Sequence, residues 1–322
     1  MFSYHFNSTL DINKHLIDIE AIKISFENSK ILPQLEEKIL RQSILRSSVF
    51  SARIEGNPLS LQNYDRYNDE HIHKIEINNL LKTYQKLNNS DTVPILTIKK
   101  IKSLHEEVMN NLSPMTGKFR QEPWAIFDQS GNVIHLAPTF LKLPELMEEY
   151  LTYIDSIQDH PVIKSAIAQF VFEKIHPFAD GNGRTGRLIS MLILKQANYH
   201  FRGMLPFEEY TDTHRQAYYY ALEPSTDITE FIEYFLKSLV VTGKQLLTKI
   251  KNTLDSLPQL SPRRQEILSI ITDHPNCSFN FLQRRFSQVN SKTLHYDLLQ
   301  LMKKGLVIKL GTTRAVVYTI SK

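Results

Sequence analysis

The feature that most constrains this chain is the segment 176–187, which reads His-Pro-Phe-Ala-Asp-Gly-Asn-Gly-Arg-Thr-Gly-Arg. Glycine is scarce in the chain, at 10 of 322 residues, so a cluster of glycines carries information. Gly181 and Gly183 let the backbone turn tightly and come close to a ligand. Apolar residues at helical spacing begin at Leu188, so the loop leads into the N-terminus of a helix. Free N–H groups and the helix dipole at that position form a binding site for an anion.

The charged side chains of the same segment extend this anion site. Arg184 and Arg187 are three residues apart, so both guanidinium groups can reach one side of the first helical turn, which suits a polyphosphate. Asp180 needs a positive neighbour there, and a Mg²⁺ ion held by its carboxylate and by phosphate oxygens would supply one. His176 titrates near neutral pH and suits a general base. From the residues alone, a structural loop and a hydrolytic metal pair of His176 and Asp180 are the alternatives.

At every specified position the segment resembles the signature of the Fic family, His-x-Phe-x-Asp/Glu-Gly-Asn-Gly-Arg-x-x-Arg. The resemblance implies a mainly helical core and transfer of AMP from ATP to a Ser, Thr or Tyr hydroxyl of a target protein, including the enzyme itself. It implies that His176 is the catalytic base and that Asp180 binds Mg²⁺. The residues implied to bind the phosphates are Gly181, Asn182, Gly183, Arg184 and, for the γ-phosphate, Arg187. Doc relatives, which phosphorylate, lack the second glycine, so Gly183 favours nucleotidyl transfer.

A β-hairpin is predicted between Trp124 and Leu136, where two short apolar runs flank a Gly-containing turn. It resembles the flap of the family, which binds the backbone of the target as an added strand beside the nucleotide. Ile126 and Phe127 are the flap residues expected to face the nucleotide. A surface excursion without function is the alternative that the residues alone leave open.

The pair Tyr218-Tyr219 begins a Tyr-Tyr-x-x-Leu segment that resembles the one near the adenine in the family. An aromatic stripe in the core is the alternative. Relatives often place an Asn shortly afterwards, whereas this chain has Glu-Pro-Ser-Thr at 223–226, which puts that contact in doubt. Altogether the resemblance covers about residues 40–240.

An upstream segment, Ser51-Ala-Arg-Ile-Glu55-Gly56, resembles the inhibitory motif of the family, Ser/Thr-x-x-x-Glu-Gly/Asn. The resemblance implies an inhibitory helix at about 44–56 within the same chain. Glu55 would enter the nucleotide site, pair with Arg187 and occupy the place of the γ-phosphate. ATP would then bind only in a pose whose α-phosphate is misaligned for attack. Ser51, one helical turn earlier, would help to fix Glu55, and Gly56 also suits a helix end.

The C-terminal part of the chain differs from the rest in charge. From Pro262 to Lys322 there are ten Lys and Arg but three Asp and Glu, a net charge of +7, whereas the remainder carries −3. Leu-Pro-Gln-Leu-Ser-Pro at 257–262 predicts a linker, so we expect a Fic domain at 1–255 and a second domain at 256–322. The patterns of the second domain predict helices at 264–273, 279–286 and 291–304, and strands at 306–310 and 315–320. This order is typical of a winged helix-turn-helix domain.

The third of these helices resembles a winged-helix recognition helix. Its outward residues are expected to be Lys292, Thr293, His295 and Tyr296, which a DNA groove would meet. Arg314 in the wing would contact phosphate. A module for protein interaction or dimerisation is the alternative, because many winged helices never touch DNA. A homo-oligomer is therefore left open.

Composition restricts the remaining possibilities. The single cysteine, Cys277, excludes an internal disulfide and a cysteine-rich metal site. No apolar run reaches the roughly 18 residues of a membrane span, and the N-terminus lacks the features of a signal peptide, so we expect a cytoplasmic protein without a membrane partner. Helical periodicity elsewhere predicts helices at 35–50, 98–109, 141–157 and 162–175.

These observations predict an autoinhibited protein adenylyltransferase that uses ATP and Mg²⁺. Two alternatives stay open: a DNA-binding regulator whose Fic core senses a nucleotide, and a hydrolase that removes AMP. The intact His176 argues against the sensor, because sensing ATP needs the phosphate site but not a base.

Overall fold

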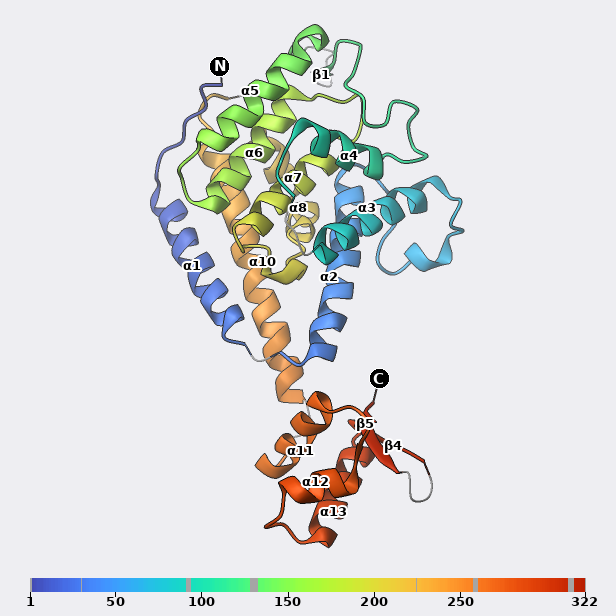
Figure 1. Cartoon of the computed structure of the whole chain (residues 1–322). Helices are drawn as coiled ribbons and strands as arrows, with labels where there is room; N and C mark the ends of the chain where they lie inside the picture. The colour runs from blue at the N-terminus through green and yellow to red at the C-terminus, as the bar shows by residue number, and fades with distance from the viewer. Residues whose placement is uncertain are drawn as a thin grey trace. The chain divides into compact units, whose positions relative to one another are not determined.

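The chain is described by a computed structural model that covers residues 2–29, 31–90, 94–127, 133–223, 225–256, 260–311 and 316–321. It forms two compact units, a larger unit at 1–249 and a smaller unit at 250–322 (Figure 1). The boundary expected from the sequence, between residues 255 and 256, lies at the C-terminal end of α10 (Thr229–Ser256). Among the described residues, we find no helix with the length and apolar character needed to cross a membrane.

The larger unit is built from helices. They are α1 (Leu10–Glu27), α2 (Pro33–Ile54), α3 (Ile72–Asn89), α4 (Ile98–Val108), α5 (Leu143–Ser156), α6 (Pro161–Ile175), α7 (Asn182–Gln196), α8 (Glu208–Thr213), α9 (Arg215–Ala221) and most of α10, with 3₁₀ turns at Tyr64–Arg66, Phe140–Lys142 and Phe201–Gly203. The four helices predicted from periodicity correspond to α2, α4, α5 and α6. The prediction of a mainly helical fold is confirmed.

Helices α6 and α7 pack against each other at the centre of this unit. Every residue of α7 from Asn182 to Lys195 is buried, and α6 is apolar around most of its circumference. A helix that is apolar all round has to be covered on all sides, which places this pair inside the fold. The loop 176–181 that joins them is therefore held at both ends by the core.

Helix α2 packs against α3 and α8 and ends beside the loop. Gly56 adopts a left-handed backbone conformation, with φ of +97°, and the N–H of Asn57 reaches back to the carbonyl of Ala52 at 3.1 Å. Such an ending is common where glycine follows the last helical residues, because it carries no Cβ. Glu55 is thereby fixed at the C-terminal cap of α2.

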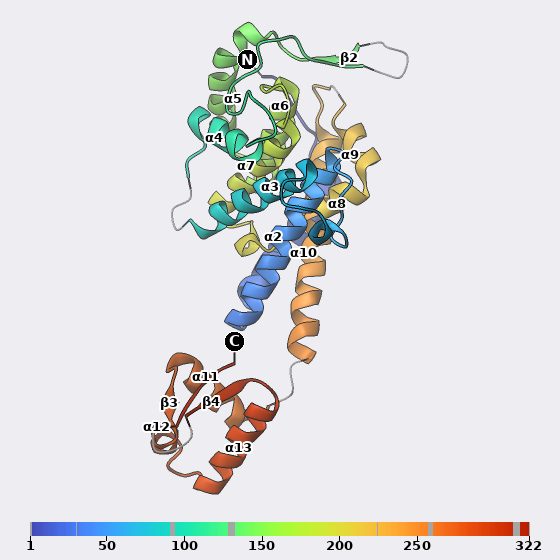
Figure 2. The ribbon, with the colours of Figure 1, turned by 90° about the vertical axis from the view of Figure 1, so that its right-hand side faces the viewer.

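The predicted hairpin is present as β1 (Ala125–Phe127) and β2 (Val133–Leu136), which pair antiparallel with Ala125 opposite Leu136. Figure 2 shows it reaching out from the helical body of the larger unit. The turn between the strands, 128–132, lies outside the described residues.

The smaller unit combines α11 (Pro262–Asp273), α12 (Phe279–Arg285) and α13 (Ser291–Lys303) with a three-stranded antiparallel sheet. Its strands are β3 (Cys277–Ser278), β4 (Val307–Leu310) and β5 (Val317–Ile320), in the order β3-β5-β4. The three helices and the two longer strands were predicted, whereas β3 was missed because two residues give no alternation of apolar and polar side chains. Arg314 lies outside the described residues.

Candidate functional site

The loop after α6 has the backbone geometry that its glycines predict. His176 and Gly181 both take the left-handed conformation, with φ of +49° and +80°. The side-chain oxygen of Asn182 accepts the N–H of Phe178 at 2.9 Å, and its amide donates to the carbonyl of Phe178 at 2.8 Å. Asn182 thus closes the loop upon itself, so its side chain shapes the phosphate site rather than reaching into it.

A cleft of about 740 Å³ opens over this loop. Its described lining includes Glu55, Trp124, Glu173, His176, Asp180, Gly181, Asn182, Gly183, Tyr218 and Tyr219. The cleft therefore brings together the loop, the end of α2, the start of the flap and α9. Its volume suits a ligand of nucleotide size.

His176 lies in this cleft with a defined tautomer. Its ring stacks on Trp124, with the centroids 3.4 Å apart, and Nδ1 lies 3.3 Å from the carbonyl oxygen of Glu173. Because a carbonyl only accepts, Nδ1 carries the proton and Nε2 keeps its lone pair. Burial lowers the pKa of His176 to about 3, and the positive charge of Arg120 acts in the same direction. The imidazole is therefore neutral at physiological pH and available as a base.

His105 of α4 contacts the loop 176–181. It was not predicted from the sequence as a site residue. Its ring stacks on Phe178 at 3.7 Å. Nε2 donates to the carbonyl of Asp180 at 2.9 Å, while Nδ1 accepts the N–H of Gly117 at 2.9 Å. Burial lowers the pKa of His105, so it bridges these two backbone groups as a neutral ring.

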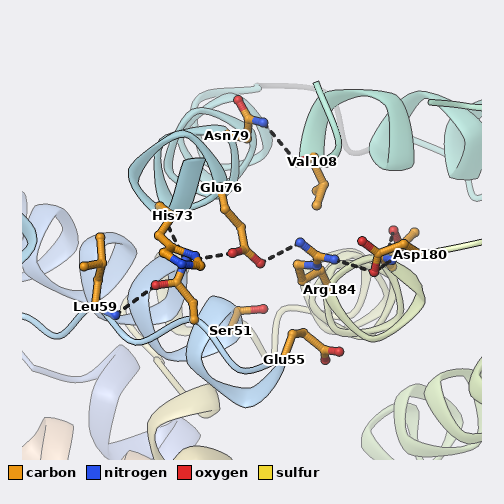
Figure 3. Close-up of polar contacts among 12 residues, drawn as sticks. Ser51, Glu55, Leu59, His73, Glu76, Asn79, Val108, Asp180 and Arg184 are labelled. Atoms are coloured by element: carbon orange, nitrogen blue, oxygen red, sulfur yellow. Dashed lines mark hydrogen bonds and ion pairs between the residues drawn. The ribbon is translucent and has the colours of Figure 1, made fainter. Parts of the chain in front are cut away.

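Asp180 projects from the loop into the cleft, with a side chain that is 66% exposed. Its Oδ1 accepts the N–H of Gly181 at 2.6 Å and an N–H of Arg184 at 2.7 Å. Arg184 is buried and pairs on its other side with Glu76 of α3 at 2.5 Å (Figure 3). Among the described residues that line the cleft, Arg184 is absent. The predicted contact of Arg184 with phosphate is therefore not prepared in this arrangement.

Arg187 is fully buried and forms the ion pair that the sequence predicted. Its Nη2 donates to Glu55 Oε1 at 2.9 Å and to the carbonyl of Ser51 at 2.8 Å, and its Nε donates to Ser51 Oγ at 3.0 Å. A Cβ on Gly183 would collide with Glu55 Oε1. The Glu55 carboxylate thus lies directly against the first turn of α7, where the loop is expected to bind phosphate.

A second carboxyl, Glu173 of α6, lies close to the same arginine. Burial and the nearby Glu55 raise the pKa of Glu173 to about 8. Its Oε1 is buried without a hydrogen-bond partner in the described part of the chain, as is Nη1 of Arg187. Glu173 was not predicted as a site residue, although it stands three residues before His176.

Tyr218 and Tyr219 both line the cleft. Tyr218 is buried and its hydroxyl accepts from Gln169 at 3.0 Å, whereas Tyr219 is half-exposed and donates to the carbonyl of Ile54 at 2.9 Å. Tyr218 therefore joins the core and the cleft wall at once. The side chains of Ile126 and Phe127 lie outside the described part of the structure, so their place near the nucleotide stays a prediction.

The site fits a divalent cation that is shared with phosphate. Within the described residues, no group of three His, Cys, Asp or Glu side chains could hold a metal ion. Asp180 offers an exposed carboxylate beside an anion site, and Mg²⁺ typically takes one or two carboxylates together with phosphate oxygens and water.

The sequence is similar to those of known proteins. Residues 95–194 match the sequence model of the Fic/DOC family. Curated proteins called protein adenylyltransferase Fic are 28% identical over 213 residues in Aedes aegypti and 32% identical over 173 residues in Drosophila mojavensis. These matches cover 60% and 52% of this chain but 40% and 31% of the relatives, so the chain spans less than half of their length.

Solved structures support the fold. A Fic family protein from Desulfovibrio desulfuricans is 24% identical, with a TM-score of 0.69, and the match covers 99% of this chain and 98% of the other. Fic-1 from C. elegans is 21% identical, with a TM-score of 0.59, and covers 75% of this chain and 73% of its own.

Proposed function

We propose that the protein is an adenylyltransferase that transfers AMP from ATP to a Ser, Thr or Tyr hydroxyl of a target protein, because residues 95–194 match the sequence model of the Fic/DOC family. One observation carries the proposal: His176, a neutral base, and the N-terminal turn of α7, an anion site, line the same cleft. A nucleotide sensor would need the second feature but not the first.

The geometry supports a direct displacement at the α-phosphate. His176 Nε2 takes the proton of the target hydroxyl, whose oxygen forms a bond to the α-phosphorus. The bond to the β-phosphate breaks, and pyrophosphate leaves with the electron pair. Asp180 would hold the Mg²⁺ ion that neutralises charge on the phosphates. Backbone N–H groups of Asn182 and Gly183 bind the phosphate oxygens at the helix N-terminus, whereas the N–H of Gly181 donates to Asp180.

The same cleft supports autoinhibition. Glu55 occupies the space beside Gly183 and pairs with Arg187, the residue proposed to bind the γ-phosphate. Two anions cannot share this place, so ATP has to displace Glu55 or bind in a pose that misdirects its α-phosphate. Ser51 fixes Arg187 through two hydrogen bonds and thereby keeps the pair in register.

The flap is proposed to bind the target. In the described part of the chain, β1 and β2 form a sheet of two strands, whose edges could accept an additional strand, and Val133 and Leu136 are exposed on it. The identity of the target is a question for labelling in a lysate.

The test is transfer of label from α-labelled ATP in the presence of Mg²⁺. We expect His176→Ala to lower transfer by about 10²- to 10⁴-fold. Its affinity for ATP, measured by calorimetry, should stay the same because the loop and α7 are intact. Near-normal transfer by the variant would rule out His176 as the base. Loss of label from a pre-modified protein, without transfer, would favour the hydrolase.

We propose a second function, weak DNA binding, for the smaller unit. Its helix α13 buries Leu294, Leu298 and Leu301 and exposes Lys292 and Tyr296 on the opposite face, as a winged-helix recognition helix would. Arg263 and Arg264 are not counted toward this surface, because both pair with the buried Asp297, at 2.5 and 2.7 Å.

The full chain should bind duplex DNA at low salt, with an affinity that falls steeply as salt rises. Lys292→Glu should weaken binding, whereas Lys86→Glu, the same change on the larger unit, should not. If the full chain shows no binding at low salt, the smaller unit is a protein-interaction module instead.

A further inference from the structure

We infer that Glu76 is a positioning residue: it holds Arg184, and Arg184 in turn sets the carboxylate of Asp180 for the divalent cation. The inference rests on the proposed function in one respect, the assignment of Asp180 as the cation ligand. Nothing in the loop sequence indicates it, because Glu76 lies on α3, 108 residues before Arg184.

The three side chains form a continuous ionic chain between α3 and α7 (Figure 3). Glu76 Oε1 lies 2.5 Å from Nη1 of Arg184, and Nη2 of Arg184 lies 2.7 Å from Oδ1 of Asp180. The side chains of Arg184 and Glu76 are 6% and 11% exposed, whereas that of Asp180 is 66% exposed. The three linked side chains therefore have a buried end at Glu76 and an exposed end at Asp180, which lines the cleft.

The planar guanidinium makes this arrangement directional. It can bridge two carboxylates only if both lie near its plane, so the position of Glu76 fixes the position of Asp180. Nε of Arg184 is buried and has no partner among the described residues. To donate a hydrogen bond to a phosphate, Arg184 would therefore have to break its contact with Glu76 or with Asp180.

The second carboxylate oxygen of Glu76 links Glu76, Arg184 and Asp180 to the end of α2. Glu76 Oε2 accepts from Asn57 Nδ2 at 2.7 Å, and the same amide donates to the carbonyl of His73 at 2.9 Å. Asn57 follows Glu55 by two residues. The segment that presents the inhibitory carboxylate is therefore also anchored, through Glu76 and Arg184, to the cation ligand.

The test measures how tightly Mg²⁺ binds in the ATP complex, by titrating ATP affinity at a series of Mg²⁺ concentrations with calorimetry. We expect Glu76→Gln, which keeps the shape but removes the charge, to weaken Mg²⁺ about 10- to 100-fold, as is typical for the partner of a metal ligand. ATP affinity without Mg²⁺ should not change. The matched control is Glu36→Gln, which breaks the exposed pair of Glu36 with Arg202 and should alter neither value.

A second variant tests the same inference if Glu76→Gln fails to fold. The double variant Glu76→Gln/Arg184→Gln leaves no unpaired buried charge of this pair, so it should fold. It should lose at least as much Mg²⁺ affinity as the single variant, because it removes the contact of Arg184 with Asp180 as well as that with Glu76. Unchanged Mg²⁺ affinity in either folded variant overturns the positioning role.

The readout separates this inference from the proposed function. A protein that binds ATP with Mg²⁺ and transfers nothing refutes the transferase alone. A protein that transfers AMP while Glu76→Gln keeps full Mg²⁺ affinity refutes the role of Glu76 alone.

Discussion

The two arginines of the loop stand three residues apart and have opposite surroundings. Arg184 lies between Glu76, in the middle of a helix, and Asp180, and Arg184 does not line the cleft. Arg187 pairs with Glu55, a residue at the cap of a helix that itself lines the cleft. Neither arginine is among the described residues that line the cleft. Arg184 keeps a buried counter-ion, Glu76, in addition to the exposed Asp180, whereas the carboxylate that accepts from Arg187 is Glu55, which a ligand in the cleft can reach.

The difference indicates a structural role for the pair of Arg184 with Glu76 and fits the proposed inhibitory role of the pair of Arg187 with Glu55. A carboxylate held inside a helix by a further hydrogen bond, as Glu76 is by Asn57, contributes to the fold. A carboxylate at a helix end, as Glu55 is at the C-terminal cap of α2, is expected to be able to turn its side chain away while the backbone cap stays in place. Four predictions test this contrast, from the largest expected effect to the smallest.

Removing the carboxylate of Glu55 should raise activity. We expect Glu55→Gly to increase AMP transfer by about ten- to a thousandfold, because each ~1.4 kcal/mol shifts a population tenfold and a lost ion pair is worth a few kcal/mol. Self-labelling should rise in parallel. Arg187→Ala should not reproduce the gain, because it removes the γ-phosphate ligand together with the inhibitory partner. A folded Glu55→Gly variant that binds ATP and is no faster than the wild type would refute autoinhibition.

The two carboxylates should differ in their effect on stability. Glu76→Ala leaves Arg184 buried with only the exposed Asp180 as a counter-ion, and we expect the free energy of unfolding to fall by about 3–5 kcal/mol. Glu55→Ala should cost only about 1–2 kcal/mol, because Arg187 keeps both hydrogen bonds to Ser51 and because Glu173, whose pKa Glu55 helps to raise, can ionise as the replacement counter-ion. Denaturant unfolding of the two variants measures both values. Equal losses would remove the distinction drawn between the arginines.

Protonation of His176, the proposed base, should not limit activity at physiological pH. Because the pKa of His176 is lowered to about 3, the ring stays neutral and kcat/KM should show no histidine titration between pH 8 and pH 5. The shift also predicts that His176 lowers stability as the pH falls below about 6.5 toward 3, since the folded state resists the proton that the unfolded chain binds.

Trp124→Ala provides the matched variant for this pH profile. It exposes the ring of His176, so the pKa should rise toward its usual value and activity at pH 6 should fall relative to pH 8. A wild-type profile that already loses activity with a midpoint near pH 6.5 would contradict the assignment.

The smallest effect is expected at Glu173. Its pKa of about 8 means that the folded state keeps a proton that the unfolded chain loses above about pH 4.5, so stability falls as the pH rises from 4.5 to 8. Glu173→Gln should therefore raise the Tm at pH 8 by about 2–4 °C and leave it unchanged near pH 4. A lower Tm at pH 8 would show that the charged Glu173 supports Arg187 instead.

The sequence predicted what is local or carried by a motif. The pairing of Glu55 with Arg187, which lie 132 residues apart, was expected from the resemblance to an inhibitory motif. The glycines of the loop and the helix that follows it rest on spacings within short segments. The flap hairpin and the small C-terminal helices followed for the same reason. These features depend on backbone preferences and on periodicity, which a single sequence contains.

The contacts of Arg184 could not be predicted from local sequence patterns. Its partner Glu76 is one carboxylate among many, and only the packing of α3 beside α7 brings them together. A weak signal exists: Glu76, Leu80 and Thr83 share one face of α3, and a carboxylate on a buried face requires a cation. His105 was missed likewise, since its bond to Asp180 spans 75 residues.

The collision between a Cβ on Gly183 and the carboxylate of Glu55 also limits how this protein can change by mutation. Any side chain at position 183 would displace Glu55 and so abolish the restraint. The same side chain would stand where the proposed phosphate site approaches the backbone, so such a substitution should impair ATP binding as well. If Glu55 is inhibitory, substitutions that relieve inhibition and keep activity are therefore expected on the α2 side of the contact, at positions around Ser51 and Glu55.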